Sequence, residues 1–456
     1  MKFAKRAAFA MTIASLLKAL PATVVERQLA LVNSETLRQN IQTASLVDKL
    51  RQLQEMADQT RSRSRFIGTA AHAETLSYIY SQLNHTGYYN IDTQRFTASY
   101  DHAELMVNRV SYKSLAFTFS PLANVSTSLV AAERQGCAPE DYPAEVEGNV
   151  VIISPGSCSY DAKATAAGQA GAFGAVIYNS IEGEVVLEGQ FEAPGNFIPT
   201  VGVSWETGQA LLQSLGDVIL FIAPRDVVTY NIIAETRGGD HDNVLMLGAH
   251  TDSVAAGPGI NDNGSGTIGV LEVALQLSRS STTNAVRFAF WSANEIGAHG
   301  SRHYISTLSQ AEARKIRLYL DFDTIASPNY VYEVLDGDGS AFGMPGARGS
   351  GAVKRLWQDY FEGLQIETTP ARLNGTGDFE PFLSAGIAVG GLSSGADGLK
   401  SQKDCENHGG QAGAPYDPNY HTARDRLVNI NTQVFLEITK AIAHAVATLA
   451  RSFETL

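Results

Sequence analysis

The C-terminal half of the chain alternates short runs of apolar residues with longer amphipathic segments. The apolar runs predict buried strands, and the amphipathic segments predict helices. The strands are expected over 244–247, 285–292, 317–325 and 387–391, and the helices over 266–278, 351–364 and 432–453. This alternation is typical of α/β domains. We therefore expect a central mixed sheet with helices on both faces, in a domain that includes residues 226–456.

The N-terminal part reads mostly as helix up to residue 85. Leu76, Ile79, Tyr80 and Leu83 recur on one helical face, and Gly87 ends this helix before a predicted strand over 92–99. We assign residues 23–110 to the same large domain. Its first part, 23 to about 60, is open to two interpretations: a removed pro-segment, or part of the mature domain.

Residues 111–225 have a different pattern of apolar runs and interrupt the large domain. Buried-strand runs over 150–153 and 175–178 flank an alanine-rich helix over 161–170, which predicts a compact α+β module. Cys137 and Cys158 lie inside it. In a secreted protein we expect a disulfide between them; two free buried thiols are the alternative.

The composition narrows the class of protein. The chain has 456 residues, of which 44% are hydrophobic and 18% charged, so it is too apolar to be disordered and long enough for two or three domains. The net charge of −13 argues against binding to nucleic acid or anionic membranes as the main role. No internal apolar run reaches the ~20 residues that a membrane span requires.

Residues 1–22 have the parts of a secretory signal. Lys2, Lys5 and Arg6 precede an apolar run over 7–17, and Ala22 offers a small residue at a plausible cleavage point. An uncleaved helix is the alternative. We expect secretion, or delivery to a vacuole or another extracytoplasmic lumen. Glycosylation triplets, which also arise by chance, begin at Asn84, Asn124, Asn263 and Asn374.

Chemistry-bearing residues gather near the ends of the predicted strands, where open α/β sheets place their ligand sites. They are His250, Asp262, Glu295, Asp323 and His421. Each alone is more often a surface or capping residue, and only their joint order carries weight. Two imidazoles and three carboxylates suit zinc above other ions, and they suffice for two ions if one carboxylate bridges.

Two neighbouring features support such a site. Asp252, two residues after His250, is expected to accept the far ring N–H of that histidine and fix its tautomer. Glycines at 257, 259, 264 and 266 allow a tight loop that brings Asp262 back beside His250.

Long ordered motifs resemble a known family. They are Gly-Ala-His-Thr-Asp-Ser at 248–253, the glycine- and asparagine-rich loop 257–266, Glu-Ile-Gly at 295–297 with Gly-Ser at 300–301, Asp323 before Ser-Pro-Asn at 327–329, and Tyr-His-Thr-Ala at 420–423 with Asp425. The chain after residue 22 resembles the secreted and vacuolar di-zinc aminopeptidases of the aminopeptidase Y type. Residues 156–160 and 171–172 resemble the protease-associated domain inserted in such enzymes.

The resemblance implies a role for each residue and two zinc ions per chain. His250 and Asp323 would hold one ion, Glu295 and His421 the other, and Asp262 would bridge them. The ions would activate a shared water. Tyr420 would donate a hydrogen bond to the developing oxyanion. The substrates would be peptide or protein N-termini, with the free amine beside carboxylates near one ion.

The chain departs from the family at the catalytic base. The family has two adjacent glutamates where this chain has Asn294 and Glu295, so an asparagine occupies the position of the general base. An asparagine amide does not accept and pass on a proton at neutral pH. General-base help is worth about 10²–10⁴-fold in rate. We therefore weigh a slowed or rerouted hydrolase against a zinc-binding pseudopeptidase that serves as a binding protein.

Further departures lie nearby. Thr376 and Gly377 replace an arginine–serine pair of the family, and Asn419 and Arg424 replace a pair of cysteines that flanks the last histidine. Cys405 is then either unpaired or paired outside the family pattern. A one-zinc reaction such as N-terminal glutaminyl cyclisation is a third interpretation, and no feature favours it.

Overall fold

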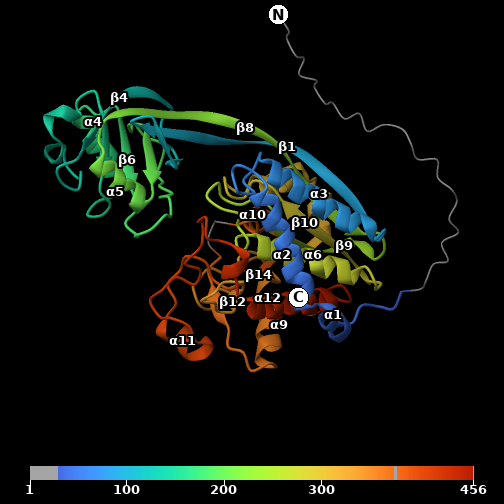
Figure 1. Ribbon diagram of the computed structural model, residues 1–456. Coiled ribbons are helices and arrows are strands. Elements are labelled where there is room, and N and C mark those ends of the chain that lie inside the picture. Colours follow the sequence, from blue (N-terminus) through green and yellow to red (C-terminus); the bar gives the residue numbers. More distant parts are fainter. Residues whose placement is uncertain (1–28, 374–376, 455) are drawn as a thin grey trace, which may run out of the picture.

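The computed structural model describes residues 29–373, 377–454 and 456, and it contains two bodies joined by a long two-stranded ribbon (Figure 1). The expected signal at 1–22 and the triplet at 374–376 lie outside the described residues. The ribbon consists of β1 (Tyr89–Val107) and β8 (Asp217–Thr236), which pair antiparallel from Tyr89↔Thr236 to Val107↔Val218. At ~3.4 Å per residue its length is about 60 Å.

The larger body is built on a mixed sheet, as the sequence predicts. Its strands run in the order β13-β12-β14-β11-β9-β10-β8, with β1 paired to β8. Strands β14, β11, β9 and β10 are parallel, whereas β12 and β8 pair antiparallel with their neighbours β14 and β10. The bounds are β9 (Asp240–His250), β10 (Asn284–Trp291), β11 (Ile316–Phe322), β12 (Glu333–Leu335), β13 (Thr369–Ala371) and β14 (Val389–Ser393).

Helices cover both faces of this sheet, because its central strands are apolar on both sides. Leu245 and Leu247 of β9 face one layer, while Met246 faces the other. The first layer contains α1 (Ser34–Asn40), α2 (Thr43–Asp58), α3 (Ala70–His85), α6 (Gly264–Leu277), α9 (Ser350–Glu362) and α12 (Thr432–Leu449). The second contains α7 (His299–Thr307) and α10 (Glu380–Ser384). The fold class is therefore confirmed.

The start of the described chain is part of this core. Leu46, Leu50 and Leu53 of α2 are fully buried, and Lys49 forms a 2.8 Å ion pair with the buried Glu272 of α6. Helix α1 contacts α12. Removal of these helices as a pro-segment would expose apolar surface of α6 and α12.

The smaller body contains β2 (Val110–Tyr112), β3 (Leu115–Ala116), β4 (Ala123–Ala131), β5 (Val150–Ile153), β6 (Gly174–Tyr178) and β7 (Thr200–Val203), with helices α4 (Tyr160–Gln169) and α5 (Trp205–Gln213). The strand order is β8-β4-β5-β6-β7-β3. Cys137 and Cys158 form a disulfide in this body. The strand predicted over 92–99 covers only part of the N-terminal half of β1, because much of the ribbon is exposed and lacks a regular apolar pattern.

The remaining elements are α8 (Gln310–Lys315) and α11 (Gln402–His408), with short 3₁₀ turns over Pro139–Asp141, Ala144–Val146 and Leu427–Asn429. Within the described part of the chain, no helix has both the length and the apolar character needed to span a membrane.

Candidate metal centre

The five expected ligands meet at the carboxyl edge of the parallel strands. His250 is the last residue of β9, Asp323 directly follows β11, and Glu295 lies in the loop after β10. Asp262 precedes α6, and His421 lies in the loop before α12. The prediction that Asp323 lies within its strand was wrong, because β11 ends at Phe322 where its pairing with β14 ends.

The ligand atoms form two groups that share Asp262. His250 Nε2 lies 3.4 Å from Asp262 Oδ1 and 3.4 Å from Asp323 Oδ2. His421 Nε2 lies 3.0 Å from Asp262 Oδ2 and 3.4 Å from Glu295 Oε2. Within each group the ligand atoms lie within 4.8 Å of one another. The shared carboxylate offers one oxygen to each group, which is the arrangement expected of a bridging ligand.

The donor atoms fit a cation better than they fit one another. His250 and Asp262 are 2% and 4% exposed, so water cannot solvate their charges freely. Glu295 Oε1 is buried and has no hydrogen-bond partner among the described residues. Buried carboxylate oxygens without partners are costly unless a cation or proton satisfies them. Imidazole and carboxylate donors are the ordinary ligands of zinc.

The pKa values of the ligand side chains are shifted both by burial and by the charges of neighbouring ligands. Burial alone would lower the pKa of both histidines, but the carboxylates, chiefly Asp323 for His250 and Glu295 for His421, raise both pKa values well above their usual range. Burial would raise the pKa of Asp262, yet its hydrogen bonds with the two histidines hold that pKa below its usual value. Burial, followed by the charge of Asp262, raises the pKa of Glu295 to about 8.

The loop that carries Asp262 is fixed from beneath. The Asp425 carboxylate accepts hydrogen bonds from the backbone N–H groups of Asn261, at 2.7 Å, and Asp262, at 2.9 Å. Gly259 adopts φ +60°, and a Cβ there would lie 2.2 Å from the Asp262 carbonyl oxygen, so the predicted tight turn requires glycine. Fully buried Arg65 donates to the carbonyl oxygens of the same loop at Thr251, Pro258 and Gly259.

Asp252 lies beneath the site, but its carboxylate has a different role from the expected one. The nearest acceptor to His250 Nδ1 is the backbone carbonyl oxygen of Asp252 at 3.2 Å, while the carboxylate lies 3.8 Å away. The carboxylate oxygens instead accept hydrogen bonds of 3.2 Å from the backbone N–H groups of Asn294 and Glu295. Asp252 therefore holds the Glu295 loop with its side chain and the His250 ring with its backbone.

Left-handed backbone occurs at three positions beside the ligands. Ala293, Thr324 and His421 have φ values of +64°, +49° and +56°. Such conformations cost of order 1–3 kcal/mol for residues with a Cβ and cluster at functional sites. Here they turn the chain sharply where Glu295, Asp323 and His421 must face one another.

Asn294 points toward a buried acid rather than toward solvent. Its side-chain N–H donates a 3.0 Å hydrogen bond to Asp378 Oδ2, and Asp378 Oδ1 accepts a 2.5 Å hydrogen bond from the Ser301 hydroxyl. Burial raises the pKa of Asp378 to about 6. Gly377, which replaces a family serine, lies beside this acid, whereas Thr376 lies outside the described residues.

The Tyr420 ring stacks on His421 with ring centroids 3.9 Å apart. Burial, followed by the charge of Asp262, raises the pKa of Tyr420 well above its usual value, so the hydroxyl stays protonated and can donate. Near it, Asn419 donates to Asp417 instead of forming the family disulfide with residue 424. Cys405 has no disulfide partner among the described residues.

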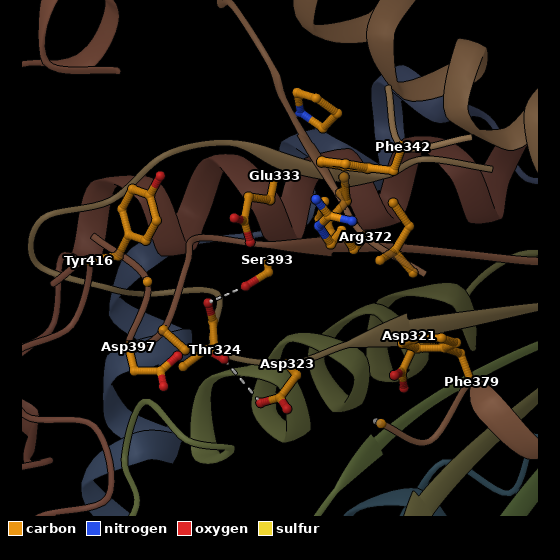
Figure 2. Close-up of a pocket in the computed structure, with 18 residues that line it drawn as sticks. Asp321, Asp323, Thr324, Glu333, Phe342, Arg372, Phe379, Ser393, Asp397 and Tyr416 are labelled. Atoms are coloured by element: carbon orange, nitrogen blue, oxygen red, sulfur yellow. Dashed lines mark hydrogen bonds between the residues drawn. The ribbon is translucent and has the colours of Figure 1, made fainter. Parts of the chain in front are cut away.

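A cavity of about 490 Å³ opens beside the candidate metal centre. Asp323 and Asp321 lie at one side of it, and Glu333, Phe342 and Arg372 lie opposite (Figure 2). The Arg372 guanidinium lies 4.3 Å from the centre of the Phe342 ring. This cavity has room for a side chain of a ligand bound at the metal centre.

Comparisons with known proteins show which family the chain belongs to. Residues 231–446 match the model of Peptidase family M28, and residues 125–211 match that of the PA domain. The chain is 42% identical to a probable leucine aminopeptidase 2 of Aspergillus fumigatus, over 93% of this chain and 87% of that protein. The chain belongs to peptidase family M28.

The chain is also similar to two further proteins. The leucine aminopeptidase 2 of Trichophyton tonsurans is 39% identical over 93% of this chain and 87% of its own length. The structure of BSAP, a zinc aminopeptidase from Bacillus subtilis, superposes with a TM-score of 0.73 at 25% identity, covering 90% of this chain and 96% of that one. The family resemblance seen in the sequence, including the inserted PA domain, is confirmed.

Sequence reasoning missed several residues that the structure brings to the site. Arg65 and Glu188 lie in segments whose pattern of apolar residues does not indicate a metal site. Glu188 belongs to the PA domain, and its carboxylate lies 2.9 Å from His421 Nδ1. Asp425 lay within a recognised motif and Asp378 directly follows the replaced pair at 376–377, but their hydrogen-bond partners could not be read from the sequence.

Proposed function

We propose that this M28 protein is a secreted zinc aminopeptidase that removes N-terminal residues from peptides, and that it binds two zinc ions. The observation that carries the proposal is the pair of ligand groups sharing Asp262. His250 and Asp323 would hold one ion, and Glu295 and His421 the other. Bound zinc would supply Lewis acidity that polarises the scissile carbonyl and makes water nucleophilic at neutral pH.

The chain's own groups account for binding and charge stabilisation. The Tyr420 hydroxyl is a protonated donor beside His421, suited to the oxyanion that forms as the peptide carbonyl is attacked. The carboxylates of the centre attract the free amine of the substrate and favour cleavage at the N-terminus. The cavity beside Asp323 would receive the first side chain.

The slow step is expected to be removal of a proton from the attacking water. Asn294 cannot take a proton from water, and its amide is already engaged with Asp378. Loss of a general base removes about 10²–10⁴-fold in rate, which corresponds to about 3–5 kcal/mol of barrier. We therefore propose slow turnover.

The decisive experiment is release of a chromogenic leucine amide by purified protein of measured zinc content. Turnover that disappears both on chelation and in His250→Ala supports the aminopeptidase. A folded, zinc-loaded wild type that is silent, beside an active Asn294→Glu variant, would instead identify a pseudopeptidase that serves as a binding protein.

The secretion part of the proposal rests on residues 1–22 and on the Cys137–Cys158 disulfide, which is typical of oxidising compartments. Asn84 and Asn124 are exposed and accessible to glycosylation, whereas Asn263 is 1% exposed and caps α6 through its side chain. N-terminal sequencing and glycosidase treatment of protein from the culture medium test both points.

A further inference from the structure

The PA domain contributes a side chain to the metal centre. Glu188 lies between β6 and β7 of the small body, yet its Oε1 atom lies 2.9 Å from Nδ1 of His421 in the large body. A second bridge lies close by, where the Lys113 ammonium donates to the Ala256 carbonyl oxygen at 3.2 Å. The two bodies therefore meet at the site as well as through the ribbon.

The segment around Glu188 is anchored. Leu187 before it is 9% exposed, and Phe191 after it is fully buried in the core of the small body. The Gly189 carbonyl oxygen accepts a 3.0 Å hydrogen bond from Thr118, and a Cβ on Gly189 would lie 2.0 Å from the Phe117 ring. These contacts hold the backbone on both sides, while the Glu188 side chain remains 53% exposed and projects toward His421.

The contact has a direct chemical meaning for His421. This histidine turns Nε2 toward Asp262 and Glu295, which leaves Nδ1 on the opposite side of the ring. Metal-binding histidines almost always donate that second N–H to a carboxylate or carbonyl, which fixes the tautomer and orientation of the ring. His250 uses the Asp252 carbonyl oxygen of its own domain, whereas His421 uses a carboxylate from the inserted domain.

We propose that Glu188 is a positioning residue, which holds His421 in the tautomer that offers Nε2 to the metal and so makes zinc affinity depend on docking of the PA domain. The inference rests on the proposed metal centre. Binding linkage is reciprocal, so zinc must strengthen the docking of the PA domain by the same factor by which docking strengthens zinc binding. The inserted domain is thereby part of the metal centre.

The first test is zinc affinity, measured by competition with a chromophoric chelator on the full chain. Glu188→Ala is expected to weaken one zinc equivalent by about 10–100-fold and to leave the other unchanged. Glu188→Gln, which keeps an acceptor but no charge, is expected to fall between Glu188→Ala and wild type. Glu182→Ala, an exposed acid in the same segment, is the matched control.

The second test is hydrogen exchange of residues 181–197 with zinc and with chelator. Zinc should slow exchange in wild type and in Glu182→Ala but not in Glu188→Ala; a merely structural role for Glu188 would give no zinc-dependent difference. Unchanged affinity for both ions in Glu188→Ala, or no zinc binding by wild type, overturns the inference. Zinc binding with the expected Glu188 effect but no peptide turnover would refute only the aminopeptidase activity.

Discussion

The side-chain amide of Asn294 donates a 3.0 Å hydrogen bond to the carboxylate of Asp378. The residue in the general-base position is therefore held by an acid. A glutamate at this position would face the Asp378 carboxylate, and like charges this close raise the pKa of a carboxyl group. A glutamate at position 294 would therefore restore the carboxyl group of the general base, but the pH would decide whether that group is ionised.

Asn294→Glu should raise peptidase activity by about 10²–10⁴-fold at its plateau. Because Asp378 raises the pKa of the introduced carboxyl, the base form appears only as pH rises. The ratio of variant to wild-type kcat/KM should therefore be small in mild acid and increase toward neutral pH. Asn294→Gln has the same length without a titrating group and should remain as slow as wild type. An equal gain in both variants would exclude a general-base explanation.

The zinc content of ligand variants should distinguish the shared ligand Asp262 from His250 and His421. Asp262 belongs to both ligand groups, whereas His250 and His421 each belong to one. We expect His250→Ala and His421→Ala each to retain about one zinc per chain, and Asp262→Ala to retain less than one, by elemental analysis after dialysis. Equal losses in all three variants would argue for a single ion.

Arg65 should contribute strongly to the stability of the fold, although it is neither a proposed metal ligand nor a catalytic residue. It is fully buried and donates to three loop carbonyl oxygens beneath the site. Leaving a buried acceptor unsatisfied costs about 1–3 kcal/mol, so Arg65→Met should lower the free energy of unfolding by at least about 3 kcal/mol in urea titrations. Arg61→Met, at an exposed position four residues earlier, should be nearly neutral.

Stability should also fall in mild acid because of His72. This histidine is 2% exposed, and burial lowers its pKa from 6.5 to about 4. Between these values the unfolded chain binds the proton and the folded chain does not, so stability rises with pH across this window. The loss below pH 4 is about 3 kcal/mol. Chemical denaturation in chelator at several pH values should show a flatter profile for His72→Gln than for wild type.

Asp262 and His421 were expected in loops, and Asp323 was expected inside its strand but follows β11. His250 and Glu295 were expected near strand ends, because an apolar run gives way to polar residues at each of these points. Parallel strands bring such points to one edge without any knowledge of the loops. The same logic predicted the mixed sheet and its covering helices.

The supports of the site could not be predicted, because they join segments far apart in the chain. Arg65 contacts a loop 193 residues away, and Asp425 holds a backbone 163 residues away. No local periodicity encodes such contacts. The carboxylate of Asp252 was assigned to the wrong partner for a related reason: the Asn294–Glu295 backbone arrives from β10 and competes for it.

The PA domain is inserted at the tip of the long hairpin that β1 and β8 form. Because β1 and β8 remain paired along their whole length, the chain leaves and re-enters the large body at neighbouring points. Tyr100 pairs with Arg225, so joining these two residues through a short turn would leave every pair from there to Tyr89↔Thr236 in register. Exchange of the whole domain at that tip would thus leave the strands that carry the metal ligands in register, and it would remove Glu188 from His421.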